Sequence, residues 1–474
     1  MSLSKGSRHP CGPCCPPGTV SSVQTLTRLS AWLRLLVWAL LLPAGTAGAE
    51  PFPEIGSGFD VISYDVALTP DFIGKSVSGI EAIRLTGTAD GAQTLAFSPN
   101  ALSITRATVD GRAVETRSDA QGIVFKLDRP LRKGHVATLR FAFSGTPRRG
   151  VSWSGESVYT SYFACDWMVC LQDSPADKAD FALSLRLPQQ LSSLSNGRMV
   201  KQALPSTGQA IHRWRSQRPY SPYLFAFAAG AMRVSRQQGG HGELVYKDLT
   251  GAEADLTQLF GETAGIAAFF ASKAGVPLPN RRYTQLLVPG REAQEAATHS
   301  LIGAEELKRD LAQPERSWII AHELAHQWWG NLVTCASWRD FWLHEGVATF
   351  MTAAWKEQRH GRAAYEAELA SARQRVERAG AQGYDKPLVW SGQYPSLATR
   401  RAIHYAKGAL FLDQLRGQLG EDQFWGGLRL FTRGHAGGVV TSVDFQRAME
   451  RASGRDLKPI FQEWVFGREE SASR

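Results

Sequence analysis

The apolar residues of this chain change their spacing part-way along it, and that change limits the folds open to it. Before about residue 230 they alternate with polar residues, as in 61–69 ("VISYDVALT"), 137–145 ("ATLRFAFSG") and 180–188 ("DFALSLRLP"). A period of two is typical of half-buried antiparallel strands. In the first segment, the side chains expected on the buried face are Ile62, Tyr64, Val66 and Leu68.

From about residue 255 the apolar residues follow helical spacing instead. The run 255–275 ("DLTQLFGETAGIAAFFASKAG") is one example, and further helices are expected over 317–329, 347–375, 410–419, 443–452 and 459–467. Strands followed by helices predict an α+β fold with two domains. We expect an antiparallel β domain over 50–235 and a mainly helical domain over 236–474.

The first 49 residues have the pattern of an export signal. Arg28 and Arg34 precede the apolar run "LLVWALLLPAGTAGA", which ends in the small residues of 47–49 before Glu50. The apolar part is too short to span a bilayer, although a short membrane anchor is the alternative. The sequence therefore predicts a leader over 1–49, a periplasmic or secreted protein, and no stable membrane span once the leader is removed.

The net charge bears on whether the protein binds nucleic acid, and the cysteines bear on whether it contains a disulfide. Four basic residues of the leader contribute to the formal net charge of +9, and no dense basic run follows, so we expect no nucleic-acid partner. Cys165 and Cys170 are close enough in sequence to pair in an oxidising compartment, or else they are two buried thiols.

The segment 319–334 ("IIAHELAHQWWGNLVT") carries the chemistry. His322 and His326 are four residues apart, so in a helix they share one face and can hold one Zn²⁺. Glu323 is rotated by about 100° from His322, where its carboxylate can take a proton from metal-activated water. The alternative is an ordinary amphipathic helix that contains two histidines.

A catalytic zinc needs a third protein ligand, and "WRDFWLHEGVATF" supplies Glu345 after 18 intervening residues. The continuous stretch from His322 to Phe350 resembles the gluzincin aminopeptidases, peptidase family M1, which includes alanyl and leucyl aminopeptidases and leukotriene A hydrolase. The resemblance implies one zinc per chain held by His322, His326 and Glu345, with Glu323 as general base. Where the family usually has Asn, this chain has His344, for which we expect either a role in supporting the ligand residues or a structural role, because neighbouring residues on a helix point apart.

Two further site residues follow from the resemblance. The segment "RAIHYAKGALFLDQL" resembles the family's Y-x-K-G motif, which implies that Tyr405 donates a hydrogen bond to the oxyanion. A tyrosine packed on an amphipathic helix is the alternative. The family's G-x-M-E-N strand, whose glutamate binds the substrate α-amine, corresponds to "VPGREAQEAATHSLIG". There Glu295 is the candidate and Glu292 is a rival, unless the stretch is a solvated loop.

The resemblance also covers the first domain, through "YDVALTPD" and "CLQDSPADKADFALSLRLP". It implies a saddle-like β domain followed by a thermolysin-like domain, in a short form without the family's C-terminal domains and with a more open site. The segment "YTSYFACDWM" departs from the family's T-Q-x-x-x-x-x-A-R, which leaves the second amine-binding group unassigned.

These observations predict a zinc metallo-aminopeptidase that acts on peptides. One alternative is a zinc peptidase that does not require a free N-terminus, because the amine-binding motif is degenerate. The other is an inactive, peptide-binding relative, which the full set of ligands, base and tyrosine speaks against.

Overall fold

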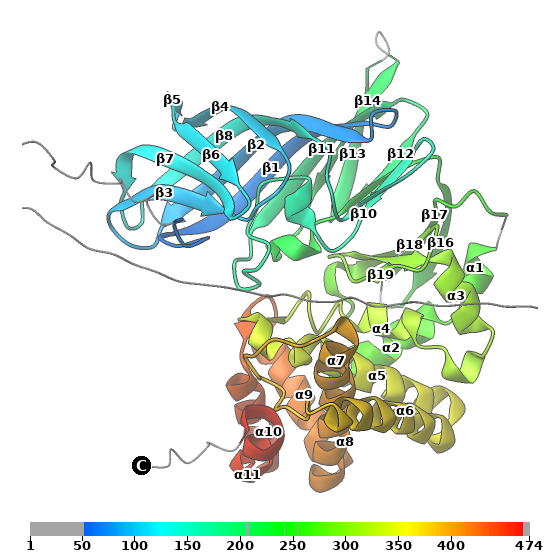
Figure 1. Ribbon diagram of the computed structural model, residues 1–474. Coiled ribbons are helices and arrows are strands. Elements are labelled where there is room, and N and C mark those ends of the chain that lie inside the picture. The colour runs from blue at the N-terminus through cyan, green and yellow to red at the C-terminus, as the bar shows by residue number, and fades with distance from the viewer. Residues whose placement is uncertain (1–51, 205–207, 241, 254, 468–474) are drawn as a thin grey trace, which may run out of the picture. The chain divides into compact units, whose positions relative to one another are not determined.

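A computed structural model describes residues 52–204, 208–240, 242–253 and 255–467 (Figure 1). The described residues belong to one compact unit, Phe52–Arg474. The expected leader, 1–49, lies outside the described residues.

The first half is built on an eight-stranded sheet with strand order β13-β14-β11-β1-β2-β8-β4-β5 (Figure 1). Within it β1 pairs with β11 in parallel, and the other neighbouring strands are antiparallel. The strands are β1 (Phe59–Asp71), β2 (Ser76–Gly87), β4 (Ser103–Val109), β5 (Arg112–Ala113), β8 (Val136–Gly145), β11 (Asp180–Pro188), β13 (Arg198–Leu204) and β14 (Gln209–Arg215).

The alternating pattern predicted the buried face of this sheet with one exception. Tyr64, Val66 and Leu68 of β1 are buried as expected. The expectation for Ile62 was wrong, because a bulge between Val61 and Ser63 shifts the register and Val61 is buried instead. A bulge adds one residue to one strand, and the alternation changes face there.

Two smaller sheets complete this half. A three-stranded sheet has the order β3-β7-β6, and a four-stranded sheet has the order β12-β15-β10-β9. Their strands are β3 (Ala92–Phe97), β6 (Glu115–Asp119), β7 (Gly122–Leu131), β9 (Val151–Ser154), β10 (Ser157–Thr160), β12 (Ser192–Ser195) and β15 (Phe227–Gly230). Buried aromatic rings of the different sheets meet in one core, as Phe125 and Phe141 do with centroids 5.3 Å apart.

A five-stranded sheet, β16-β17-β18-β20-β19, begins the second half. Its strands are β16 (Arg233–Gly239), β17 (Gly242–Asp248), β18 (Arg282–Val288), β19 (Ala293–Gln294) and β20 (His299–Gly303), with β17, β18 and β20 parallel. The sequence pattern did not reveal β18 and β20, because nearly every residue of both strands is buried and polar and apolar residues therefore do not alternate along them. The domain boundary near 235 stays a prediction.

Helices form the rest of the second half, so the α+β class is confirmed. They are α1 (Leu256–Leu259), α2 (Thr263–Ala274), α3 (Ala304–Leu311), α4 (Ile319–Ala325), α5 (Trp342–His360), α6 (Arg362–Ala381), α7 (Leu397–Arg401), α8 (Gly408–Leu419), α9 (Glu421–Gly434), α10 (Ser442–Ser453) and α11 (Lys458–Phe461), with π-helices η7 (Ala402–Lys407) and η8 (Gln462–Phe466) and the short strands β21 (Thr334–Cys335) and β22 (Val439–Val440).

The expected single helix over 347–375 is two helices. Gly361 separates α5 from α6 with a φ of 87°, a left-handed conformation that glycine adopts at little cost. The spacing of apolar residues continues across this break, so periodicity alone does not show it.

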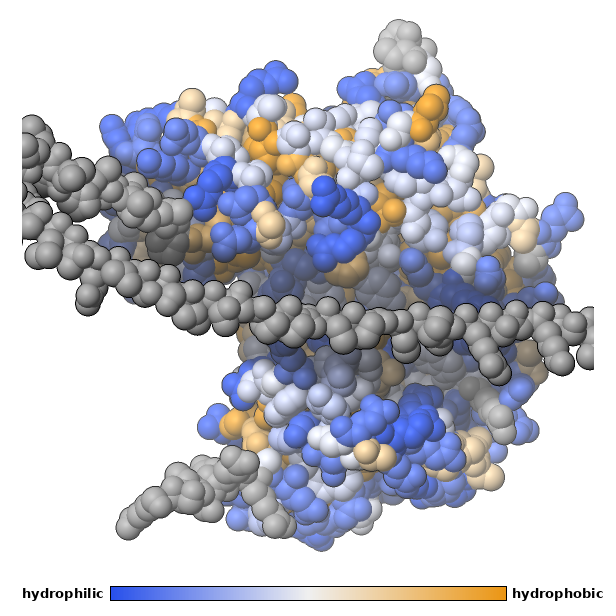
Figure 2. All heavy atoms as spheres, in the orientation of Figure 1, coloured by the Kyte–Doolittle hydropathy of each residue, from blue (hydrophilic) through white to orange (hydrophobic). Residues whose placement is uncertain are grey.

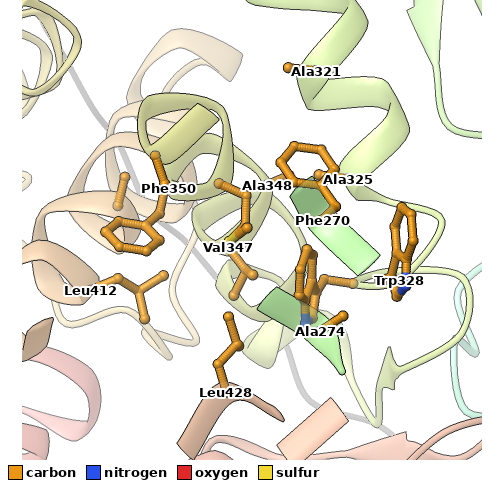
Figure 3. Packing of buried hydrophobic residues seen from close by; sticks show 14 of the residues in the cluster. Phe270, Ala274, Ala321, Ala325, Trp328, Val347, Ala348, Phe350, Leu412 and Leu428 are labelled. Atoms are coloured by element: carbon orange, nitrogen blue, oxygen red, sulfur yellow. The ribbon is translucent and has the colours of Figure 1, made fainter. Parts of the chain in front are cut away.

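The core of the second half surrounds the helix with the two histidines. Figure 3 shows Ala325 of α4 beside Phe270 of α2 and near Val347 and Ala348 of α5, and Ala321 belongs to the same cluster. Figure 2 shows that the helices in the lower part of that view carry mainly hydrophilic side chains on the side facing the viewer. Among the described helices, none combines the length and the apolar character that crossing a bilayer would take.

Candidate metal and active site

At the start of helix α4, the backbone amides donate hydrogen bonds to the carboxylate of Asp310. Asp310 accepts the backbone N–H groups of Trp318 (3.0 Å) and Ile319 (3.1 Å) and the hydroxyl of Ser317 (2.7 Å). The first amides of a helix have no partner inside it, so a capping carboxylate satisfies them and favours the positive end of the helix dipole. This cap fixes the starting point from which His322 is placed.

His322, His326 and Glu345 meet in one buried cluster. Their candidate ligand atoms all lie within 4.8 Å of one another. The three closest pairs are His322 Nε2 to Glu345 Oε2 (3.2 Å), His326 Nε2 to Glu345 Oε2 (3.3 Å) and His326 Nε2 to His322 Nε2 (3.2 Å). Tetrahedral zinc ligands at about 2.0–2.1 Å are about 3.3 Å apart, so this spacing and the N, N, O donor set fit one Zn²⁺.

Neighbouring groups set the tautomer of His326 and the ionisation of Glu345 to those that metal binding requires. His326 Nδ1 lies 3.1 Å from the carbonyl oxygen of Trp329, which holds the proton on Nδ1 and turns Nε2 toward the cluster. Burial acts to raise the pKa of Glu345, but the His326 and His322 imidazoles outweigh it and hold that pKa below the usual range. Glu345 is therefore ionised, as a metal ligand must be.

Glu323 lies beside the triad with an unused oxygen. The side chain is buried, and its Oε2 makes no hydrogen bond to any residue that the structure describes. Burial raises the pKa of Glu323 well above the usual range, and His326 opposes that shift. A buried carboxyl that binds a proton readily and has a free oxygen is suited to proton transfer at this site.

Tyr405 contacts His322. Its ring stacks on the His322 imidazole, with centroids 5.8 Å apart and planes 7° from parallel. Burial and the Glu345 carboxylate raise the pKa of Tyr405 well above its usual range, so the hydroxyl stays protonated and can donate. Tyr405 belongs to the π-helix η7, an irregularity that is frequent at functional sites.

A contact between two glycines brings η7 close to the ligand helix α5. A methyl group placed on Gly346 would lie 2.9 Å from Cα of Gly408 and 2.9 Å from the carbonyl oxygen of His404. The backbones therefore touch directly after Glu345 and three residues after Tyr405. Sequence reasoning missed this role, although both glycines stand inside the motifs that it used.

Glu295 faces the same cluster, whereas Glu292 does not. Glu295 is buried at the end of β19, and burial raises its pKa while His326 lowers it and Glu345 raises it further. Glu292 is exposed and accepts a hydrogen bond from the Ser161 hydroxyl (3.0 Å). Of the two carboxylates proposed from the sequence, the structure thus brings Glu295 to the His-His-Glu cluster.

Two side chains of the histidine motif hold the Glu295 segment. Asn331 Nδ2 donates to the carbonyl oxygen of Glu295 (3.0 Å), and Gln327 Nε2 donates to that of Ala296 (3.2 Å). Gln327 also accepts the backbone N–H of Thr298 (3.1 Å). Sequence reasoning missed these roles, but the signal was present in the letters "HQWWGN".

His344 stands apart from the metal cluster. Its Nε2 accepts the backbone N–H of Cys335 (2.7 Å), and its Nδ1 lies 3.4 Å from the hydroxyl of Tyr223. Burial lowers the pKa of His344 to about 3, so the ring is neutral. These contacts agree with the structural role that the sequence predicted.

Family comparisons match both halves of the chain. The model of the peptidase M1 N-terminal domain matches residues 61–224, and the model of the peptidase family M1 domain matches residues 293–464. Curated relatives include Aminopeptidase 2 of Candida albicans, 26% identical over 85% of this chain and 46% of the relative, and Aminopeptidase N of Streptomyces lividans, 29% identical over 62% and 36%. The chain spans about half the length of the curated relatives it matches, or less.

Solved structures agree with the family comparison. A mutant of the M1 zinc metallopeptidase from Deinococcus radiodurans superposes with a TM-score of 0.74 at 25% identity. The match covers 88% of this chain and 96% of that one. A two-domain M1 zinc metallopeptidase mutant bound to L-tryptophan has a TM-score of 0.73 at 25% identity. With both halves matched and the His-His-Glu cluster assembled, the chain belongs to peptidase family M1.

Proposed function

We propose that this chain is a zinc aminopeptidase, which removes the first residue of peptides by hydrolysis. The observation that carries the proposal is that one buried site combines a His-His-Glu metal triad with Glu323, Tyr405 and the additional carboxylate of Glu295. The relatives' printed names, Aminopeptidase 2 and Aminopeptidase N, support the same activity. The L-tryptophan in the two-domain neighbour is a free amino acid, the kind of product that such an enzyme releases.

His322, His326 and Glu345 would hold one zinc ion per chain. When bound, zinc supplies Lewis-acid chemistry, since it polarises a carbonyl oxygen and lowers the pKa of water. Glu323 accepts a proton as water adds to the scissile carbonyl carbon, and passes it to the departing amine as the C–N bond breaks. The Tyr405 hydroxyl donates a hydrogen bond to the carbonyl oxygen as negative charge develops there.

Glu295 supplies the requirement for a free N-terminus. Its carboxylate is buried beside the reacting groups, where a substrate α-ammonium group would neutralise it and make charge-assisted hydrogen bonds. An N-acetylated peptide has no such charge and would leave the carboxylate buried without a partner. This placement favours the aminopeptidase over a peptidase that ignores the N-terminus.

The test compares aminoacyl-anilides that carry a free amine with the same compounds after N-acetylation. We expect hydrolysis of the free-amine compounds only. Glu295→Gln should raise the KM for free amines far more than it lowers kcat, because the lost interaction is with the amine. Equal hydrolysis of blocked and free compounds by the unmodified enzyme would contradict the proposal.

We also propose that the protein is exported to the periplasm or the medium. The support is the leader pattern and the Cys165–Cys170 disulfide, a bond that persists in oxidising compartments. Cell fractionation with an antibody to the chain tests this. Finding the protein with its leader uncleaved in the cytosolic fraction would contradict it.

A further inference from the structure

A loop of the first half reaches β19, the strand that directly precedes Glu295. The hydroxyl of Tyr162 donates to the carbonyl oxygen of Ala293 in β19, and the backbone N–H of Tyr162 donates to Gln294 Oε1 (2.8 Å). The adjacent Ser161 hydroxyl donates to Glu292 Oε2 (3.0 Å). Three consecutive residues of the strand region are thus bonded to two consecutive residues of this loop.

The acceptor that Tyr162 occupies lies on the open edge of a sheet. Among the strands that the structure describes, β19 is the last of its sheet and pairs only with β20, where Ala293 lies opposite Ile302. The carbonyl oxygen of Glu292 accepts the N–H of Gly303 on the β20 side. Backbone groups alternate in direction along a strand, so the N–H and carbonyl of Ala293 point away from β20. Such an edge can bind an extended peptide as an added strand.

Hydrogen bonds and a disulfide fix the conformation of the Tyr162 loop. Gln172 Nε2 donates to the carbonyl of Tyr162 (2.8 Å), and Gln172 Oε1 accepts the N–H of Cys165 (3.2 Å). Asn100 Nδ2 donates to the carbonyl of Cys165 (2.8 Å), and the Cys165–Cys170 disulfide closes the turn. Tyr162 has a φ of 55°, which a bulky residue keeps only when its surroundings impose it.

Tyr162 also lies within reach of the charged groups of the site. Its side chain is 41% exposed. Burial of the hydroxyl, and then the negative charges of Glu323 and Glu295, raise the pKa of Tyr162. The residue is therefore partly exposed and close enough to Glu323 and Glu295 to feel their charges, and its hydroxyl is already bonded to the strand that a long substrate would use.

We propose that Tyr162 is a specificity-determining residue that caps the open edge of β19 and makes the site favour short substrates over long peptides. A short substrate, such as an aminoacyl amide, needs only Glu295, Tyr405 and the metal ligands. A long peptide gains main-chain hydrogen bonds by adding to β19, and the Tyr162 hydroxyl competes for the carbonyl of Ala293. The inference rests on the proposed aminopeptidase function and names its preferred substrate class.

The experiment compares kcat/KM for an aminoacyl-anilide with kcat/KM for a tetrapeptide that has the same first residue. In the zinc-loaded, full-length Tyr162→Phe variant, the tetrapeptide-to-anilide ratio should rise by about threefold to tenfold, the change that one net hydrogen bond supports. Tyr162→Ala, which also removes the ring, should raise the ratio at least as much. Tyr384→Phe deletes the same hydroxyl far from β19 along the chain and should leave the ratio unchanged.

An unchanged or lower ratio in both Tyr162 variants, in enzyme that still hydrolyses the anilide, would overturn the inference and leave the aminopeptidase proposal intact. Absence of anilide hydrolysis in the unmodified, zinc-loaded protein would instead overturn the proposed function, and the inference with it. A rise in the ratio that is equal in Tyr384→Phe would also overturn it, because the effect would not depend on β19.

Discussion

Replacing Gly346 by alanine tests whether the glycine contact positions Tyr405. The added methyl group would lie 2.9 Å from Cα of Gly408 and 2.9 Å from the carbonyl oxygen of His404, both backbone atoms that cannot rotate away. Carbon atoms in contact are normally about 3.5–4.0 Å apart. The helix segment with Tyr405 must therefore move from α5 by roughly 0.5–1 Å, at a cost of about 1–3 kcal/mol in stability.

The displacement should lower the catalytic rate and leave zinc binding unchanged. The candidate zinc ligands lie on α4, at its C-terminal cap and on α5, whereas Tyr405 lies on η7, the segment that is pushed away. A misplacement of about 1 Å can cost about 100-fold in rate. We expect Gly346→Ala to bind zinc normally and to lose kcat by about 10-fold to 100-fold, measured with an aminoacyl-anilide at saturating concentration.

Gly417→Ala is the matched control, because it makes the same change within α8 at a site where a methyl group meets no atom within 4 Å. It should gain about 0.5–1 kcal/mol in unfolding free energy, since alanine favours a helix over glycine, and keep its kcat. The reasoning is refuted if Gly346→Ala keeps the kcat and the stability of the unmodified protein.

Three further variants test the scaffold by urea denaturation. Lys178 Nζ lies 3.1–3.4 Å from four main-chain carbonyl oxygens of the second half, which share its three N–H groups. Lys178→Met should therefore cost about 2 kcal/mol, and a cost near zero would contradict this. Burial and then Asp60 raise the pKa of Asp177 to about 7, above its unfolded value. The free energy of unfolding should therefore fall as pH rises from about 4 to about 7, by at most about 1.4 kcal/mol per pH unit. Asp177→Asn should remove this dependence on pH, and an unchanged dependence would refute the assignment. Replacing Cys165 and Cys170 by alanine should cost about 2 kcal/mol for so short a loop, and equal stability would contradict a bracing role.

Local spacing predicted the parts of the site that lie on one element. His322 and His326 are a helical turn apart, so their shared face follows from the sequence alone. Glu345, Tyr405 and Glu295 come from other elements, and their meeting with the histidines depends on tertiary packing. Their assignment required the resemblance to family M1, which carries information on distant contacts that periodicity lacks.

The elements that sequence reasoning missed have physical causes of the same kind. The bulge after Val61 and the break at Gly361 are single-residue changes that leave the surrounding pattern intact. Tyr162 reaches Ala293 across 131 positions of the chain, and no local pattern marks that contact. The Gly346–Gly408 contact was visible only as two glycines within longer motifs.

The most direct test of the central claim measures zinc content and anilide hydrolysis together, in the unmodified protein and in Glu323→Ala. The account predicts one zinc per chain in both, hydrolysis by the unmodified protein, and a rate at least about 100-fold lower in Glu323→Ala. Glu323 would then be needed for proton transfer and not for holding the metal. Unmodified protein that binds no zinc, or a Glu323→Ala variant that keeps its full rate, would contradict the account.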